Sequence, residues 1–171
     1  QLYRHDCSYG SDPGEGFPSP TTLTFTHAYD NGTMAQTVMV TGRDDFYDDD
    51  NITYTVTMSV VEASLQDEYE SVVPDTVTLI NFDNDTAGFT YGAISDNTSE
   101  NGSIVNFTVQ LDTRPIGTER VVLVPSSSDT TEGTVLPSVM VFMNSNWQNP
   151  QTVTVTGVND DLNDDNQTFT V

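Results

Sequence analysis

The chain has 171 residues and a formal charge of −22, from 26 acidic residues against 4 basic ones, all of them arginine. This excess of negative charge makes nucleic acid and anionic membranes unfavourable partners. No apolar run approaches the roughly 20 residues that a membrane-spanning helix needs, so we expect no membrane insertion. The length fits one or two globular domains.

Aspartate outnumbers glutamate by 19 to 7, and the aspartates gather in short runs. Short carboxylate side chains in loops are typical ligands of hard cations such as calcium. A solvated acidic surface, as in a secreted or halophilic protein, is the alternative explanation. Cys7 is the only cysteine, so it is either a spare thiol or half of a bridge to another chain.

One pattern occurs twice, at segments 36–42 and 151–157, which lie 115 positions apart. An Asp/Asn-rich loop follows each segment, and a second alternating segment comes after it, at 51–56 in the first copy and 166–171 in the second. Apolar residues at every second position on both sides of an acidic loop predict strand, loop, strand. A copy at this spacing indicates tandem domains.

Taken in chain order, the same alternation and the turn residues between its segments predict many short strands and no helix of normal length. The turn-rich segments 11–16 and 128–133 also match each other, and residues 62–70 are expected to form a long hairpin loop. The predicted strands are 23–26, 36–41, 52–60, 76–82, 89–91, 104–111, 121–124, 139–142, 152–156 and 166–171.

This pattern predicts an all-β fold of tandem, immunoglobulin-like antiparallel β-sandwiches, with about one and a half repeat units in the chain. Residues 1–86 are expected to be the C-terminal part of one repeat. Residues 87–171 are expected to be the N-terminal part of the next.

Seven asparagines stand in N-glycosylation sequons: Asn31, Asn51, Asn84, Asn97, Asn101, Asn106 and Asn166. Asn51, Asn106 and Asn166 fall on the outward phase of their predicted strands. A glycan on any of these three would project into solvent without disturbing the core.

Several features follow one another along the chain: Ala87-Gly88-Phe89 at the start of a unit, Glu100 before the strand 105–111, Asp129 to Gly133, Trp147 ahead of Thr152 to Thr156, and the acidic segments Asn159-Asp160-Asp161 and Ile80 to Asp85. In their order and spacing they resemble the Calx-β repeat and its relatives in extracellular adhesins and other tandem-repeat surface proteins.

The resemblance implies calcium at one end of each sandwich. The implied ligands are Asp44, Asp45, Asp48, Asp83 and Asp85 in the first unit, and Glu100, Asp160, Asp161 and Asp164 in the second. Carboxylates packed this densely repel one another unless a cation is present, which agrees with the implied ion. A solvated acidic loop, or a glycan on Asn84, is the alternative for the first of these sites.

Catalytic patterns are missing from the sequence, and we predict that the chain is not an enzyme. It has no glycine-rich phosphate loop, no Gly-x-Ser-x-Gly and no lysine, and its two histidines lack a metal-ligand partner at suitable spacing. Trp147 could stack on a sugar, but with Phe142 nearby it is expected to fill the core.

These features together predict a structural extracellular or cell-surface protein: a glycosylated segment of a fibre, stalk or adhesin shaft built from β-sandwich repeats. A calcium-dependent binding module for a carbohydrate or a protein is the alternative. By the 115-residue offset, the second unit lacks equivalents of residues 57–85 and the first lacks those of 89–111. An incomplete sandwich exposes unpaired backbone groups, so either the chain is an excerpt of a longer array or separate subunits complete each other by strand addition. In both cases we expect a linear filament in which each unit is completed by its neighbour, head to tail.

Overall fold

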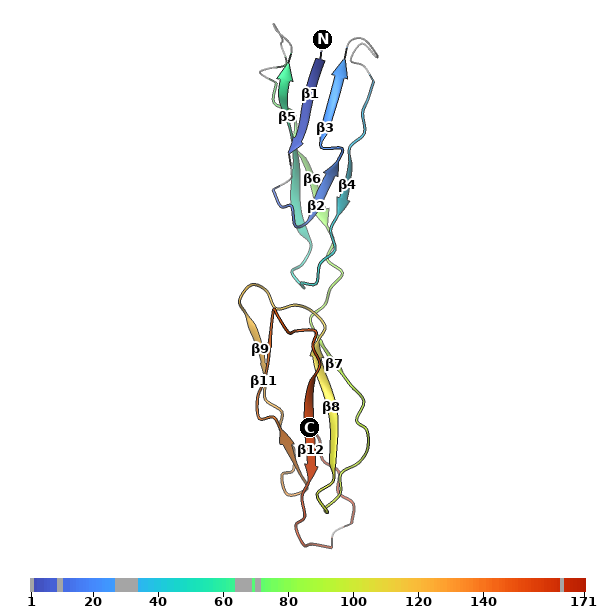
Figure 1. Cartoon of the computed structure of the whole chain (residues 1–171), viewed down its shortest axis with the longest axis vertical. Helices are drawn as coiled ribbons and strands as arrows, with labels where there is room; N and C mark the ends of the chain where they lie inside the picture. The colour runs from blue at the N-terminus through green and yellow to red at the C-terminus, as the bar shows by residue number, and fades with distance from the viewer. Residues whose placement is uncertain (1, 9–10, 27–33, 64–68, 70–71, 164) are drawn as a thin grey trace. The chain divides into compact units, whose positions relative to one another are not determined.

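The computed structural model describes residues 2–8, 11–26, 34–63, 69, 72–163 and 165–171 (Figure 1). These residues form twelve strands and no α-helix. Every strand pair is antiparallel. The prediction of an all-β fold with antiparallel sheets is therefore confirmed.

The chain divides into two compact units, the first made of Gln1–Asp45 and Asp49–Asn84, the second of Phe46–Asp48 and Asp85–Val171. The first unit has one sheet in the order β3-β1-β5-β6 and a two-stranded sheet of β2 and β4. Figure 1 shows β1 between β3 and β5. The strands are β1 (Leu2–Ser8), β2 (Gly16–Ser19), β3 (Thr22–Thr26), β4 (Met39–Gly42), β5 (Ile52–Ala63) and β6 (Val77–Asn81).

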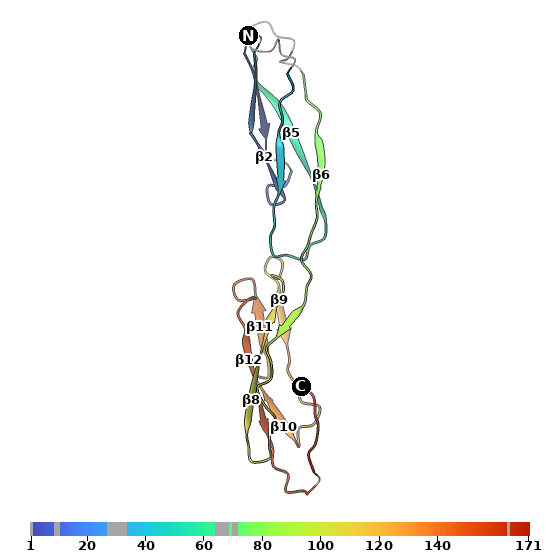
Figure 2. The same cartoon turned by 90° about the vertical axis from the view of Figure 1, so that its right-hand side faces the viewer.

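The second unit has a four-stranded sheet in the order β10-β12-β8-β7 and a two-stranded sheet of β11 and β9 (Figure 2). Its strands are β7 (Phe89–Tyr91), β8 (Ile104–Leu111), β9 (Arg120–Leu123), β10 (Gly133–Leu136), β11 (Met140–Met143) and β12 (Gln151–Gly157).

Alternation along the strands of the second unit builds its core. Val153 and Val155 of β12 are buried, whereas Thr154 between them is partly exposed. The core cluster joins residues of the β8–β12 sheet to residues of β11: Val109, Leu111, Met140, Phe142, Trp147 and Val153. The inner faces of the two sheets therefore share one apolar core.

Trp147 is 6% exposed and belongs to this core, which confirms the prediction that it fills the core. Its ring also packs on Phe46, with ring centroids 5.6 Å apart. Tyr47 lies under the guanidinium of Arg114, and Arg114 N donates to Phe46 O over 2.8 Å. These contacts explain why residues 46–48 group with the second unit.

The same local hydrogen bonds occur in both units. In the first, Ser11 N donates to Thr55 O (3.0 Å) and Thr55 N donates to Ser11 Oγ (3.2 Å). In the second, Ser128 N donates to Thr170 O (2.9 Å) and Thr170 N donates to Ser128 Oγ (2.8 Å). Ser128 lies 117 positions after Ser11, and Thr170 lies 115 after Thr55.

A glycine beneath an aromatic ring also occurs in both units. A Cβ added to Gly16 would meet the Tyr54 ring, and one added to Gly133 would meet the Phe169 ring. Both glycines begin an edge strand, where only a residue without a side chain leaves room for the ring.

The backbone conformation of the acidic loops recurs as well. Asp50 and Asp165, which lie 115 positions apart, both take left-handed backbone angles, with φ of 65° and 64°. Aspartate is one of the few residues other than glycine that enters this region often.

The structure differs from the predicted strands at four places. β1, β2 and β10 were not predicted, because β1 has no clear period and β2 contains a proline. The strand expected at 166–171 does not form, although Thr170 keeps its two hydrogen bonds to Ser128. In the first unit the equivalent residues of β5 pair with β6, and the described part of the second unit contains no strand in that place.

The core of the second unit yields a stability prediction. Phe142 is 0% exposed, so we expect Phe142→Ala to lower the free energy of unfolding of this unit by about 3–5 kcal/mol. Trp147 is the only tryptophan, so its fluorescence during denaturant unfolding reports on the second unit. Val122→Ala, at a side chain that is 46% exposed, is the control and should cost less than about 1 kcal/mol. Equal losses for the two variants would contradict this description of the core.

Candidate metal site

The pairing of β2 with β4 brings together acidic residues that are distant in the sequence. Gly16 lies opposite Gly42 in this antiparallel pair, and Arg43 N donates to Glu15 O over 2.9 Å. The residue before β2 is therefore a neighbour of the residues after β4. Glu15 thus comes to lie beside the acidic loop that begins at Asp44.

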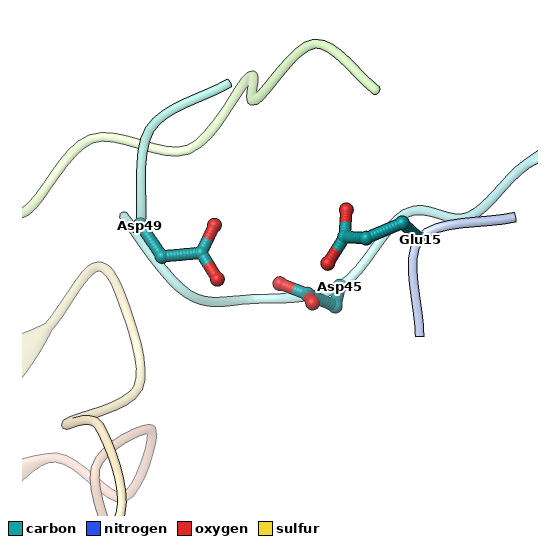
Figure 3. A group of neighbouring side chains, drawn as sticks. All are labelled: Glu15, Asp45 and Asp49. Carbon is teal, nitrogen blue, oxygen red and sulfur yellow. The ribbon is translucent and has the colours of Figure 1, made fainter. Parts of the chain in front are cut away.

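Glu15, Asp45 and Asp49 form a carboxylate cluster, which we call the acidic cluster. One carboxylate oxygen of each lies within 4.8 Å of the other two. Figure 3 shows the three carboxylates pointing toward one another. Glu15 and Asp49 are half-buried, and Asp45 is exposed. Two of the three carboxylate side chains are therefore partly covered by the protein, and the third is open to solvent.

Asn81 of β6 fixes the Glu15 side of the acidic cluster. Its Nδ2 donates to Glu15 Oε2 over 3.1 Å and to Arg43 O over 2.7 Å. A neutral amide donor orients the Glu15 carboxylate but does not cancel its charge. The two hydrogen bonds of Asn81 therefore hold Glu15 beside the start of the acidic loop.

Asp83 holds the opposite side of the loop. Its Oδ2 accepts the backbone N–H groups of Asp49 (3.0 Å) and Asp50 (3.1 Å), and its own N–H donates to Asn51 Oδ1 (3.0 Å). These bonds stabilise the turn that carries Asp49 and the left-handed Asp50. Asp83 thus fixes the turn that carries Asp49, although its own carboxylate is not part of the acidic cluster.

The pKa of Asp49 is raised above its ordinary value of 3.8. Burial is the largest cause, and the negative charges of Asp45, Glu15 and Asp83 add to it, whereas a backbone hydrogen bond acts in the other direction. Both burial and nearby like charge disfavour the ionised carboxylate. The negative charges of Asp45, Glu15 and Asp83 thus add to the effect of burial on Asp49.

Oxygen donors of this kind fit a hard divalent cation. Calcium binds six to eight oxygens, many of them from aspartate and glutamate, and it tolerates irregular geometry. Carboxylates without sulfur or imidazole ligands favour calcium, magnesium or manganese over zinc. Within the described residues, this is the one group of three or more His, Cys, Asp and Glu side chains at such spacing.

The structure separates the five ligands predicted in the first half of the chain. Asp45 lies in the acidic cluster, and Asp83 lies behind it. Asp44 is exposed, Asp85 is half-buried, and Asp48 Oδ2 accepts from Ala87 N over 2.8 Å within the second unit. One of the five therefore contributes to the cluster directly.

The four ligands predicted in the second half are not brought together in the described residues. Glu100 is exposed in the turn before β8, and Asp160 Oδ1 accepts from Leu162 N over 2.9 Å. Asp161 exchanges hydrogen bonds with Asn159, and Asp164 lies outside the residues that the structure describes.

Sequence reasoning missed Glu15 and Asp49. Glu15 stands in a turn-rich segment whose counterpart contains Glu132, and that shared position was the available signal. Only the pairing of β2 with β4 shows which loop Glu15 reaches. Asp49 lies in the predicted acidic loop. The turn that Asp83 stabilises brings Asp49, and not Asp44, into the acidic cluster.

Six of the seven sequon asparagines fall within the described residues, and all six are exposed: Asn51, Asn84, Asn97, Asn101, Asn106 and Asn166. Asn31 lies outside the described residues. Asn106 is on β8, where its Oδ1 accepts from Thr154 Oγ1 over 2.8 Å. The exposed positions are compatible with attached glycans.

Comparison of the chain with models of known protein families, with curated proteins and with solved structures gives no match. The resemblance to the Calx-β repeat therefore stays a prediction. Within the described residues, no helix has the length and apolar character required to span a membrane.

The raised pKa of Asp49 predicts a pH dependence of stability without metal. Because the folded state binds this proton more tightly than the unfolded state, the free energy of unfolding falls as pH rises from about 3.8 through the folded pKa. In EDTA, Asp49→Asn should therefore be more stable than the unchanged protein at pH 7 and should lose this advantage at low pH.

Denaturant unfolding at several pH values measures this difference. Asp44→Asn, at an exposed residue outside the acidic cluster, is the matched control and should follow the unchanged protein. An Asp49→Asn variant that is less stable than the unchanged protein at every pH would contradict the electrostatic explanation.

Proposed function

We propose that this chain is a segment of an extracellular or cell-surface structural array, a fibre, stalk or adhesin shaft built head to tail from Calx-β-like β-sandwich repeats. The observation that carries the proposal is the recurrence of one set of local contacts in the two units. The proposed array has covalent glycans and calcium, and it performs no catalysis.

The recurrence supports a tandem repeat more strongly than sequence similarity does. The Ser11–Thr55 and Ser128–Thr170 hydrogen-bond pairs, together with the Gly16 and Gly133 positions under aromatic rings, lie at offsets of 115 to 117. Independent contacts at one spacing are expected when two segments descend from one unit and keep its geometry. Repeats of this kind are typical of elongated structural proteins.

The core of the second unit supports a sandwich as the repeating unit. One apolar core lies between the β10-β12-β8-β7 sheet and the β11-β9 sheet. Two antiparallel sheets that share a core in this way are the arrangement of β-sandwich domains.

The exposed sequons support the extracellular location. Six asparagines in sequons lie on the surface of the described residues, so each can carry a glycan without a change in the core. A sheath of glycans would cover strand faces that are rich in threonine, such as the exposed face of β12.

Calcium is the proposed ligand of the acidic cluster. Glu15, Asp45 and Asp49 would hold the ion, and bound calcium would offset the negative charges that raise the pKa of Asp49. The ion would thereby stiffen the β4–β5 loop of the first unit.

Calcium is therefore expected to stabilise the chain by mass action. At a concentration 100 times its dissociation constant, a ligand of the folded state adds about 2.7 kcal/mol. Asp49→Asn should remove most of this gain, although the same variant is the more stable protein in EDTA. Thermal melting with calcium and with EDTA measures both effects, and Asp44→Asn should keep the gain. A melting temperature that is the same in calcium and in EDTA would contradict the proposed site.

The structural role itself is tested on native material. Fab fragments raised against residues 87–171 and labelled with gold should decorate extracellular fibres at a regular spacing. Mass spectrometry of the same fibres should find glycans on asparagines such as Asn106. Diffuse labelling inside cells, or bare sequons in material from a source with N-glycosylation, would contradict the proposal.

A further inference from the structure

β4 is paired along one side only in the described part of the chain, because its sheet consists of β2 and β4 alone. In an antiparallel pair, alternate residues direct their N–H and C=O groups to opposite sides. Arg43 N bonds to Glu15 O on the β2 side, so Met39 and Thr41 also face β2. Val38 and Val40 therefore present their backbone groups to the other side, which we call the open edge of β4.

The second unit shows what occupies the same edge in an equivalent strand. β12 pairs with β10 on one side and with β8 on the other, and Gly157 N bonds to Ser103 O on the β8 side. β12 residues lie 115 positions after those of β4. The open edge of β4 therefore corresponds to the edge of β12 that β8 covers.

The inward-facing valines are also less buried beside the open edge of β4 than their equivalents are beside the covered edge of β12. Val153 and Val155 of β12 are 1% and 3% exposed with β8 beside them. Their equivalents Val38 and Val40 are only half-buried. An added strand would remove this apolar surface from water as well as satisfy the backbone groups.

We propose that the open edge of β4 is an acceptor for one strand with the β8 pattern, donated by a neighbouring unit of the array. This inference rests on the proposed function, since it names the contact by which units of the array join. The donated strand runs antiparallel to β4 and extends the β2–β4 sheet.

The chemistry of β8 defines the occupant. From Ile104 to Leu111 it alternates, with Val105, Val109 and Leu111 buried on one face. It contains no charged residue, in a chain whose formal charge is −22. A strand with carboxylates would be repelled by this chain, whereas an uncharged alternating strand adds backbone hydrogen bonds and apolar contacts without that repulsion.

The register of the complex follows from the second unit. Thr154 lies opposite Asn106 and Thr156 lies opposite Ile104. The equivalent residues of β4 are Met39 and Thr41. The donated strand should therefore place its Asn106-like residue opposite Met39 and its Ile104-like residue opposite Thr41. Both positions are non-hydrogen-bonded pairs, in which side chains approach most closely.

Disulfide trapping tests the site and its register together. The full 171-residue chain with Cys7→Ser carries either Met39→Cys or Thr41→Cys, and it is mixed with a synthetic peptide of residues 102–111. The peptide carries a cysteine in place of either Asn106 or Ile104. The matched pairs are Met39→Cys with the cysteine at 106 and Thr41→Cys with the cysteine at 104.

We expect matched pairs to cross-link about tenfold faster or more than crossed pairs, because a shift of two residues moves the Cβ atoms beyond disulfide range. A peptide of the same composition in scrambled order should not cross-link selectively. Val40→Pro removes an N–H from the open edge and should slow the matched reaction while the β2–β4 pairing remains.

Equal rates for matched, crossed and scrambled pairs would overturn the proposed acceptor site. That result would leave the structural array intact if the labelled Fab fragments still decorate fibres, because units could then join by another contact. Selective trapping without any fibres in native material would instead retain the acceptor site and refute the array.

Discussion

The pairing of β2 with β4 is the interaction on which both the acidic cluster and the open edge of β4 depend. Gly16 and Gly42 face each other at one end of this pair, and the hydrogen bond from Arg43 N to Glu15 O continues it beyond the strands. That end draws Glu15 to the acidic loop and so assembles the acidic cluster. The same pairing uses one side of β4 and, among the residues that the structure describes, leaves the other side open. The candidate metal site and the proposed strand acceptor thus have one structural origin.

Charge sets a second constraint, because a chain with 26 carboxylates must separate them or supply partners. Several of its aspartates accept backbone N–H groups. Asp83 accepts from Asp49 and Asp50, and Asp129 accepts from Thr131 through both its N–H and its hydroxyl. Those bonds to Thr131 are the main reason that the pKa of Asp129 is lowered. The acidic cluster differs, because it brings carboxylates to one another and raises the pKa of Asp49.

The sequence predicts much of the fold, since alternation of apolar residues on β8 and β12 shows directly which face is buried. It also predicts the core position of Trp147. The sequence does not predict β2, because Pro18 and the turn residues before it are not typical of a strand. It also fails for the segment at 166–171, because a strand needs a partner as well as a pattern. Glu15 was missed for a related reason: strand pairing, which a local pattern does not contain, decides which loops meet.

The side chain of Arg43, next to the acidic loop, lies against an aromatic ring. It is the arginine adjacent to the acidic loop, and its backbone bonds to Glu15, yet its guanidinium lies 5.6 Å from the centroid of the Phe17 ring. At the equivalent positions the second unit has Val158 and Thr134, so this stacking is a local addition and not part of the shared contacts. A guanidinium over an aromatic ring is attracted to the negative face of that ring. No cation is among the causes that shift the pKa of Asp49, which agrees with this arrangement. This agrees with the proposal that a divalent ion, which prefers oxygen donors, binds at the acidic cluster.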